Sequence, residues 1–327
     1  MPKLAIGVDL GASNIRVGLV SENGKILSIL KEPTDKSGQD GTIVLKQIVQ
    51  IIKELQVKSK PQKKMAGIGI AAIGPLDYKK GGPQNSPNVP YEFIPLLKPL
   101  AKEFKLPIYL HNDANAAALA EKYFGAGKKI ENLVYITIST GIGGGAIVNG
   151  NLLLGKSGNA AEVGHITVDT KYNMPCTCGH GIGHWEGLAS GTNIPKFYEI
   201  WRRANSAIPH IAAEVGETKV IFAMAAAALS GAANKDSFAL DFLEELSRVN
   251  ARAVSSIIAA YDPELITIGG SVALNNPDFT INGIMKYVDH LLKVPEIKIT
   301  KLGDEIGVLG AAAAVFKKIN PSLLLKE

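Results

Sequence analysis

Both cysteines and three of the six histidines of the chain lie within about twenty residues of one another. Thiolate and imidazole groups are the usual ligands of closed, tetrahedral Zn²⁺ sites. A complete set of four is His165, Cys176, Cys178 and His184, and His180 competes for the fourth position. Nothing in the pattern requires a water molecule on this metal. The cluster therefore predicts a structural zinc ion that ties a loop in place.

Two loops rich in glycine and hydroxyl groups each follow an apolar run. In Asp9–Asn14, Gly11 lets the backbone approach a phosphate, and Ser13 can donate to it. Asp9 could hold Mg²⁺ through water, because Mg²⁺ prefers one or two carboxylates together with phosphates. The second loop, Ser139–Gly145, has four glycines that leave room for an anion. It is neither a Walker loop nor a Rossmann fingerprint, and a tight turn or a flexible loop remains the alternative for both segments.

Asp113 stands where a short strand passes into an alanine-rich helix. A side chain at such a junction can cap the helix, and either Asp113 or Asn112 suits that role. The other interpretation is a general base, because phosphoryl transfer to a hydroxyl needs positioning, charge stabilisation and a group that accepts the proton. The spacing alone does not decide between the two.

Length and composition set the broad class. A chain of 327 residues suggests two domains. Hydrophobic residues at 46% and charged residues at 20% are ordinary for a soluble globular protein, and the net charge of +5 forms no basic block, so neither nucleic acid nor membrane is an expected partner. No signal peptide or membrane-spanning run is visible. Cys176 and Cys178 are too close for an ordinary disulfide, which favours a reducing, cytoplasmic setting.

The elements that position these residues can be read from periodicity. The chain should open with an antiparallel meander that turns at Asn23-Gly24, and the strand, loop and hairpin plan recurs with a turn at Asn149-Gly150. That echo suggests a duplicated domain plan with a nucleotide between the halves. The other main elements are expected as helices at 41–55, 113–124, 237–261 and 307–319 and strands at 66–73, 107–110, 133–138 and 265–268.

Taken in order, these segments resemble the ROK family of sugar kinases and sugar-responsive repressors, within the actin/hexokinase-like superfamily. The matching segments are Asp9–Gly11, Gly69–Pro75, Ser86–Pro90, His111–Glu121, Glu162–Glu186, Ile268–Gly270 and Gly303–Ala312. The resemblance spans nearly the whole chain and implies an α/β, two-domain actin/hexokinase-like (ribonuclease H-like) fold with a central cleft. A small N-terminal domain would take residues 1–112 and a larger domain with the zinc site residues 113–306. The C-terminal helix, about 307–320, would pack back on the first domain.

The resemblance also implies an activity: ATP-dependent phosphorylation of a hexose at its 6-hydroxyl, as in a glucokinase or broad hexokinase, with Asp113 as the base. The sugar would be bound by Gly74, Asn88, Asn112, Asp113, Glu162, His165 and Glu186. Mg²⁺ and ATP would be held by Asp9, Gly11, Ala12, Ser13, Asn14, Thr140, Gly141, Gly143, Gly269 and Gly270. Members of the family are often dimeric, so a cytoplasmic homodimer in glycolysis is expected.

Two departures from the family pattern fall in the metal segment. The family typically has a third cysteine where His184 stands, and two residues rather than three between Cys178-Gly179 and Gly183. Imidazole replaces thiolate well at Zn²⁺, so a metal site should survive. The longer turn leaves the choice between His180 and His184, and the placement of Glu186, open.

Other functions remain to be weighed against a hexose kinase. A kinase for N-acetylglucosamine or N-acetylmannosamine would need room for an acetamide near residues 71–74 and Asn88. A repressor of the same family would carry a helix-turn-helix domain before the phosphate loop, and the residues before Asp9 leave no room for one. A fructokinase or a sugar sensor without activity is less favoured. The cluster at 162–186 disfavours an actin-like or chaperone-type ATPase.

Overall fold

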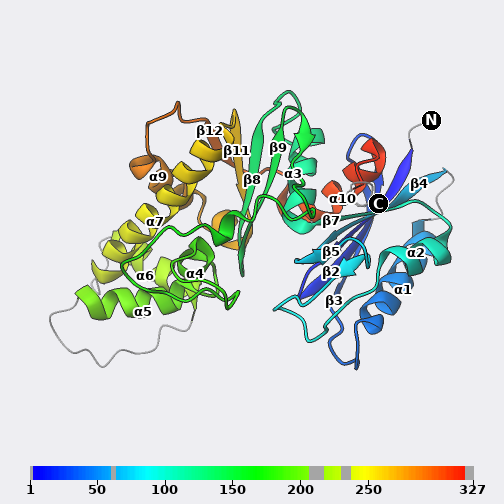
Figure 1. Ribbon diagram of the computed structural model, residues 1–327, viewed down its shortest axis with the longest axis horizontal. Helices are drawn as coiled ribbons and strands as arrows, with labels where there is room; N and C mark the ends of the chain where they lie inside the picture. The colour runs from blue at the N-terminus through cyan, green and yellow to red at the C-terminus, as the bar shows by residue number, and fades with distance from the viewer. Residues whose placement is uncertain (1–2, 60–63, 206–216, 230–236, 321–327) are drawn as a thin grey trace. The chain divides into compact units, whose positions relative to one another are not determined.

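The computed structural model describes residues 3–59, 64–205, 217–229 and 237–320. The chain forms two compact units (Figure 1). Unit 1 contains Met1–Tyr135, Gly145–Ala161 and Thr300–Glu327, and unit 2 contains Ile136–Gly144 and Glu162–Ile299. The polypeptide therefore passes between the units at four places, and both of its ends belong to unit 1.

Unit 1 is built on a five-stranded sheet with the order β3-β2-β1-β4-β7. These strands are β1 (Leu4–Leu10), β2 (Asn14–Ser21), β3 (Ile26–Pro33), β4 (Met65–Ala72) and β7 (Ile108–Asn112). The first three form an antiparallel meander, and β1, β4 and β7 run parallel. The central strand β1 is an almost continuous buried run, whereas the edge strand β3 alternates between partly buried and exposed residues, as its single covered face requires.

Helices cover both faces of this sheet (Figure 1). On one face lie α1 (Thr42–Ser59) and α2 (Leu97–Phe104), and on the other lie α3 (Asp113–Tyr123) and α10 (Ile306–Lys317). The buried positions of α1 recur at helical spacing: Val44, Ile48, Ile51, Ile52 and Leu55. Two very short strands, β5 (Leu76–Asp77) and β6 (Gly82–Pro83), form a separate ribbon.

Helix α10 lies very close to the sheet because two strands have glycine beneath it. A Cβ atom on Gly7 of β1 would overlap the carbonyl oxygen of Val308, and one on Gly69 of β4 would overlap that of Ala311. This close approach places Gly307, near the start of α10, against the end of β1: a Cβ on Gly307 would lie 2.6 Å from the carboxyl carbon of Asp9.

A second sheet has the order β10-β9-β8-β11-β12. Its strands are β8 (Leu133–Ile138), β9 (Ile142–Val148), β10 (Asn151–Leu152), β11 (Leu265–Gly269) and β12 (Glu296–Ile299), with β8 and β9 divided between the two units. The helices of unit 2 are α4 (Trp185–Ala189), α5 (Ile194–Asn205), α6 (Thr218–Leu229), α7 (Ser237–Tyr261), α8 (Ser271–Asn275) and α9 (Pro277–Tyr287). Short 3-10 turns are η1 (Val163–His165) in unit 2 and η2 (Gly303–Glu305) in unit 1.

The core of unit 2 includes an aromatic cluster between α5 and α7. Phe197, Tyr198 and Trp201 of α5 each meet the ring of Phe242 on α7 edge to face, with centroids 5.0 to 5.7 Å apart. Helix α7 also packs against α4, α6 and α9. Four other helices of unit 2, α4, α5, α6 and α9, therefore pack on α7.

The local expectations from the sequence are largely confirmed. Asn149 and Gly150 both have positive φ, +49° and +76°, as a two-residue hairpin turn requires. The helix expected at 237–261 has those bounds as α7. Contacts group α3 with unit 1, whereas the sequence-based division at residue 112 assigns it to the larger domain. No helix within the described ranges is both long and apolar enough to cross a membrane.

Candidate functional site

The residues expected to bind ligands are divided between the two units. Unit 1 carries Asp9, Gly11, Ala12, Ser13, Asn14, Gly74, Asn88, Asn112 and Asp113. Unit 2 carries Thr140, Gly141, Gly143, Glu162, His165, Glu186, Gly269 and Gly270, together with Cys176, Cys178 and His184. Each set is best understood within its own unit.

Asp9 lies near the end of β1, opposite Arg16 of β2 in the antiparallel register. A guanidinium nitrogen of Arg16 donates to its carboxylate at 3.1 Å. The pKa of Asp9 is raised to about 6, chiefly by burial; Arg16 lowers it, and the carboxylates of Asp113 and Asp304 contribute to the rise. The carboxylates of Asp113 and Asp304 both act electrostatically on Asp9, and this concentration of negative charge favours a cation at the end of β1.

The loop after β1 is fixed by one hydrogen bond within it and by two from Thr34. The backbone N–H of Gly11 donates to the carbonyl of Asn14 at 3.0 Å. Thr34, which follows β3, donates through its hydroxyl to the carbonyl of Gly11 at 2.7 Å and through its amide to the carbonyl of Ser13 at 3.0 Å. With its carbonyls engaged in this way, the loop is a fixed turn rather than a flexible segment.

Asn112, rather than Asp113, is the N-cap of α3. The side chain of Asn112 accepts from the amide of Ala114 at 3.0 Å, and its backbone is non-helical, with φ −58° and ψ 149°. Asp113 is the first helical residue, and one of its carboxylate oxygens also accepts from Ala114, at 2.8 Å. The capping function is thus met by Asn112, and a carboxylate at the first turn is stabilised by the positive end of the helix.

The other predicted sugar residues of unit 1 lie in turns. Gly74 is next to the side chain of Asn112, because a Cβ on Gly74 would lie 2.9 Å from its amide nitrogen. Glycine at this position therefore leaves room for the Asn112 amide. Asn88 is exposed, and its carbonyl accepts from the ammonium group of Lys36 at 3.2 Å.

In unit 2 the glycine-bearing loop between β8 and β9 is braced by two neighbouring turns. The amide of Gly191 donates to the carbonyl of Ser139 at 2.7 Å, and the hydroxyl of Thr192 donates to the carbonyl of Thr140 at 2.9 Å. The hydroxyl of Ser139 lies 3.0 Å from that of Ser271, which follows Gly270. The structure therefore brings the two predicted nucleotide segments of this unit together.

The backbone conformation and the close packing at Gly270 favour glycine over any residue with a side chain. Its φ of +86° is one that other residues rarely adopt, and a Cβ there would lie 2.5 Å from the carbonyl oxygen of Ile138. The turn after β11 therefore passes directly over the end of β8. A side chain at this position would push the two strand ends apart.

The four predicted metal ligands gather in one place. The ligand atoms of His165, Cys176, Cys178 and His184 all lie within 4.8 Å of one another. The Sγ of Cys176 is 3.7 Å from Nδ1 of His165, and the Sγ of Cys178 is 3.7 Å from Nδ1 of His184. Ligands at about 2.3 and 2.05 Å from a tetrahedral Zn²⁺ would be about 3.6 Å apart, so the donor set fits this ion. His180 is not part of the group.

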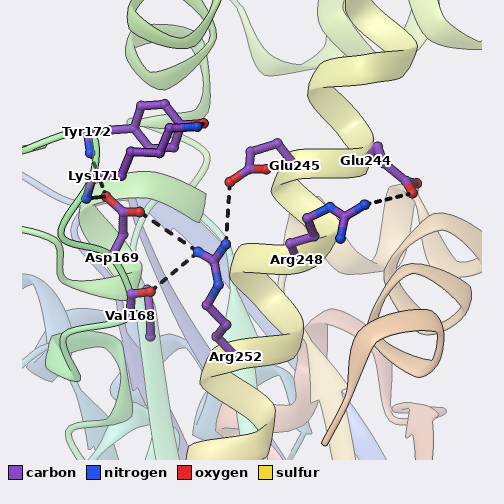
Figure 2. Close-up of polar contacts among 8 residues, drawn as sticks. All are labelled: Val168, Asp169, Lys171, Tyr172, Glu244, Glu245, Arg248 and Arg252. Carbon is purple, nitrogen blue, oxygen red and sulfur yellow. Dashed lines mark hydrogen bonds and ion pairs between the residues drawn. The ribbon is translucent and has the colours of Figure 1, made fainter.

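Helix α7 anchors the loop that carries these ligands. Figure 2 shows Arg252 of α7 reaching the carbonyl of Val168 at 3.5 Å and the carboxylate of Asp169 at 3.8 Å. Asp169, whose side chain is almost fully buried, also accepts from the amides of Lys171 and Tyr172. These contacts fix the chain that leaves His165.

The returning chain is fixed on the same helix. The indole N–H of Trp185 donates to the side chain of Asn250 at 2.8 Å, and both residues are buried. The amide of Trp185 donates to the carbonyl of Ile166 at 3.0 Å, which closes the base of the loop. Because Trp185 lies between His184 and Glu186, this anchor sets the position of a metal ligand and of a predicted sugar ligand at once.

Glu162, His165 and Glu186 lie close together. Nε2 of His165 is 3.9 Å from the carboxylate of Glu162, while its Nδ1 faces Cys176, so the two ring nitrogens point to different partners. Partial burial raises the pKa of Glu162, His165 lowers it, and the carboxylate of Glu186 raises it. His165 therefore lies between the predicted metal ligands and the carboxylates of Glu162 and Glu186.

A family model described as the ROK family matches residues 5–318. The chain belongs to the ROK family. A glucokinase of Pyrobaculum calidifontis is 37% identical over 316 residues, which cover 95% of each chain. A xylose repressor of Caldicellulosiruptor bescii is 29% identical and is matched over 77% of its length by 95% of this chain.

Among solved structures, a ROK family glucokinase from Streptomyces griseus in complex with glucose and AMPPNP is 30% identical. It superposes with a TM-score of 0.74 over 94% of this chain and 98% of the other. The predicted membership of the ROK family and the predicted α/β, actin/hexokinase-like fold are thereby confirmed.

Sequence reasoning missed several residues at these sites: Arg16, Thr177, Thr192 and Ser271. Arg16 has a detectable signal, because a hairpin register places it opposite Asp9. Ser190-Gly191-Thr192 has the same small and hydroxyl composition as Ser139-Thr140-Gly141, which is a second signal. The contacts of Thr177 and Ser271 depend on how distant loops meet and leave no mark on the sequence.

Proposed function

We propose that this chain is an ATP-dependent hexose kinase of the glucokinase type, which transfers the γ-phosphoryl group of ATP to the 6-hydroxyl of the sugar. The observation that carries the proposal is the whole-length likeness to glucokinases, one of which has been solved with glucose and AMPPNP. The identity to the glucokinase of P. calidifontis, 37%, exceeds the 29% identity to the xylose repressor, which favours the enzyme over the sensor.

In this proposal Asp113 is the general base. The oxygen of the sugar 6-hydroxyl attacks the γ-phosphorus, its proton passes to the Asp113 carboxylate, and the bond from the γ-phosphorus to the bridging oxygen of ADP breaks. Because Asn112 already caps α3, the Asp113 carboxylate is not required for that structural role. Its carboxylate is held in place by the amide of Ala114, which donates to one of its oxygens at 2.8 Å.

The phosphates of ATP would be bound by the two glycine-bearing loops. Gly11–Asn14 is held open by Thr34, and the loop at Thr140–Gly143 is braced by Gly191 and Thr192. Asp9 suits a Mg²⁺ ion held through water, because the surrounding carboxylates favour a cation. That ion would neutralise charge on the phosphates. Gly269 and Gly270 would line the nucleoside side.

Sugar hydroxyls would be bound by Asn88, Asn112, Glu162, His165 and Glu186, with Gly74 leaving space beside Asn112. Such polar groups discriminate between sugars, because a missing hydroxyl leaves one of them unpaired.

The Cys/His cluster would hold a structural Zn²⁺. The spacing of its donors fits a tetrahedral ion, and all four coordination positions are supplied by protein. Burial raises the pKa of the Cys176 thiol to about 11, so binding of a metal must displace a proton that the free thiol keeps at neutral pH. The ion would fix the loop that leads to Glu186.

A coupled assay for ADP formation tests the function directly. Purified protein with ATP and Mg²⁺ is given glucose, mannose, fructose, glucosamine, N-acetylglucosamine or N-acetylmannosamine in turn, and glucose is expected to give the highest kcat/KM. The acetamido sugars separate a hexose kinase from an N-acetylhexosamine kinase. If no sugar stimulated ADP formation, the proposal would fail.

Asp113→Asn tests the base. The variant should fold and bind glucose, since Asn112 keeps the cap, but should lose turnover by several orders of magnitude. The matched control is Asp278→Asn, which removes an exposed carboxylate from the first turn of α9 and should leave turnover unchanged. Near-normal turnover of Asp113→Asn would refute its assignment as the base.

The domain division at residue 112, the homodimer and the cytoplasmic location stay predictions. Sedimentation of the purified chain tests the dimer. The contacts of α3 with α10 favour a first domain that extends beyond residue 112 and includes the C-terminal helix.

A further inference from the structure

Glu186 is held by donors from two different loops. The backbone N–H of Ile142, in the glycine-bearing loop, donates to its Oε2 at 2.9 Å. The hydroxyl of Thr177 donates to its Oε1 at 2.7 Å, and the Sγ of Cys176 lies 3.8 Å from the same oxygen. Thr177 stands between Cys176 and Cys178, so its position is set by two members of the metal cluster.

We propose that Thr177 is a positioning residue that orients the carboxylate of Glu186 for the sugar. Sugar affinity then depends on residues 165–186, the segment with the predicted metal ligands, which we call the metal loop. The inference rests on the proposed function, in which Glu186 binds a sugar hydroxyl. Thr177 itself touches neither the reacting atoms nor the metal in this scheme. It acts through Glu186.

The geometry leaves the carboxylate fixed but still able to bind. A carboxylate oxygen has two lone pairs, so an oxygen that accepts one hydrogen bond can accept another. The Ile142 amide holds one oxygen and the Thr177 hydroxyl holds the other, which together prevent rotation of the group. Oε2, which accepts from the Ile142 amide, keeps a second lone pair for a sugar hydroxyl, and less rotamer freedom is lost when the sugar binds.

Gly141 shows how close the approach is on the other side. A Cβ atom on Gly141 would lie 2.6 Å from Oε2 of Glu186. The carboxylate therefore occupies space that a larger residue in the glycine-bearing loop would take. Contacts from two loops therefore restrict the orientation of the Glu186 carboxylate.

The test compares Thr177→Val, which keeps the shape and removes the hydroxyl, with Thr177→Ser, which keeps the hydroxyl. Calorimetry measures the Kd of glucose and, separately, of AMPPNP, and elemental analysis measures zinc per chain. Thr177→Val should raise the Kd of glucose about fivefold, equal to ~1 kcal/mol, with AMPPNP affinity and zinc content unchanged. Thr177→Ser should restore glucose affinity. Thr170→Val, at an exposed threonine of the same loop, should change nothing.

A double-mutant cycle separates a positioning role from a structural one. If Thr177 acts through Glu186, Thr177→Val should cause no further loss of glucose affinity in a Glu186→Gln background. Wild-type affinity in Thr177→Val would overturn the inference, and so would a loss of affinity that accompanies loss of zinc. A wild-type protein that binds no hexose would overturn the proposed function itself, which is a different result.

Discussion

The charge of Asp9 is set by competing neighbours at the end of β1. Burial and the carboxylates of Asp113 and Asp304 raise its pKa to about 6, and Arg16 opposes them. An acidic group with a raised pKa gains its charge only as the pH rises through that value. A Mg²⁺ ion held through Asp9 would therefore be bound less well below about pH 6.

Arg16→Met should move this dependence to higher pH. Without the guanidinium the pKa of Asp9 rises above about 6, so the acid limb of kcat/KM for ATP at subsaturating Mg²⁺ should shift upward. Arg203→Met, at an exposed arginine of α5, is the control and should leave the limb in place. An unchanged profile in Arg16→Met would show that Asp9 does not control the limb.

At the scale of elements, the metal loop is a segment whose two ends are fixed on α7 while its middle carries the cysteines. Arg252 holds the outgoing chain at Val168 and Asp169, and Asn250 holds the returning chain at Trp185. The ends are therefore ordered by protein contacts, and the proposed Zn²⁺ would be needed only to order the part between them. Removal of such an ion should affect this loop more than the rest of unit 2.

His184→Ala and His180→Ala form a matched pair for the metal site. His184 belongs to the four-ligand group and His180 does not, although the two lie on the same short turn. His184→Ala should lower zinc content well below that of the wild type and weaken glucose binding, whereas His180→Ala should keep both. Elemental analysis after dialysis measures the difference, and equal zinc content in the two variants would contradict the assignment.

Local signals in the sequence account for much of this site. Cys176, Cys178 and His184 lie close in the chain, and the alanine-rich run after Asp113 predicts a helix to about residue 124, where α3 ends at Tyr123. Whether Asn112 or Asp113 caps that helix could not be read, because both residue types suit the position. The bracing of Ser139 by Gly191 and Ser271 depends on tertiary contacts between segments far apart in the sequence.

At the scale of the whole molecule, a buried histidine joins two distant parts of unit 1. Nε2 of His111, at the end of β7, lies 2.8 Å from the carbonyl of Ile319, just after α10. A carbonyl can only accept, so this nitrogen carries the proton. Burial is the main cause that lowers the pKa of His111 to about 4, and its bond to Ile319 acts in the opposite direction.

This histidine should make global stability depend on pH. The His111 imidazole takes up a proton near pH 6.5 in the unfolded chain but only near pH 4 in the folded chain. Its contribution to the free energy of unfolding is therefore fully present above pH 6.5 and is lost as the pH falls toward 4. Between pH 7 and pH 5 the loss from this group should be roughly 2 kcal/mol. His111→Gln should not show this decrease in the free energy of unfolding between pH 7 and pH 5, whatever its stability at pH 7.

Urea unfolding of both proteins at the two pH values measures the effect. Asp9 contributes in the opposite direction, because its raised pKa makes the folded state bind a proton more tightly than the unfolded chain near pH 5. That contribution is present in both proteins and cancels in the comparison. Equal pH dependence in the wild type and His111→Gln would disprove the role of His111.

The four passages of the polypeptide between the units have a practical consequence for anyone who dissects the protein. Because both ends belong to unit 1, no single cut separates one unit from the other. A protease that nicks any one connection would leave two fragments, each with part of unit 1 and neither with all of it, so each depends on the other to complete that unit. Isolated units would have to be made by circular permutation or by joining the ends of excised segments, and a nicked protein could stay assembled and active.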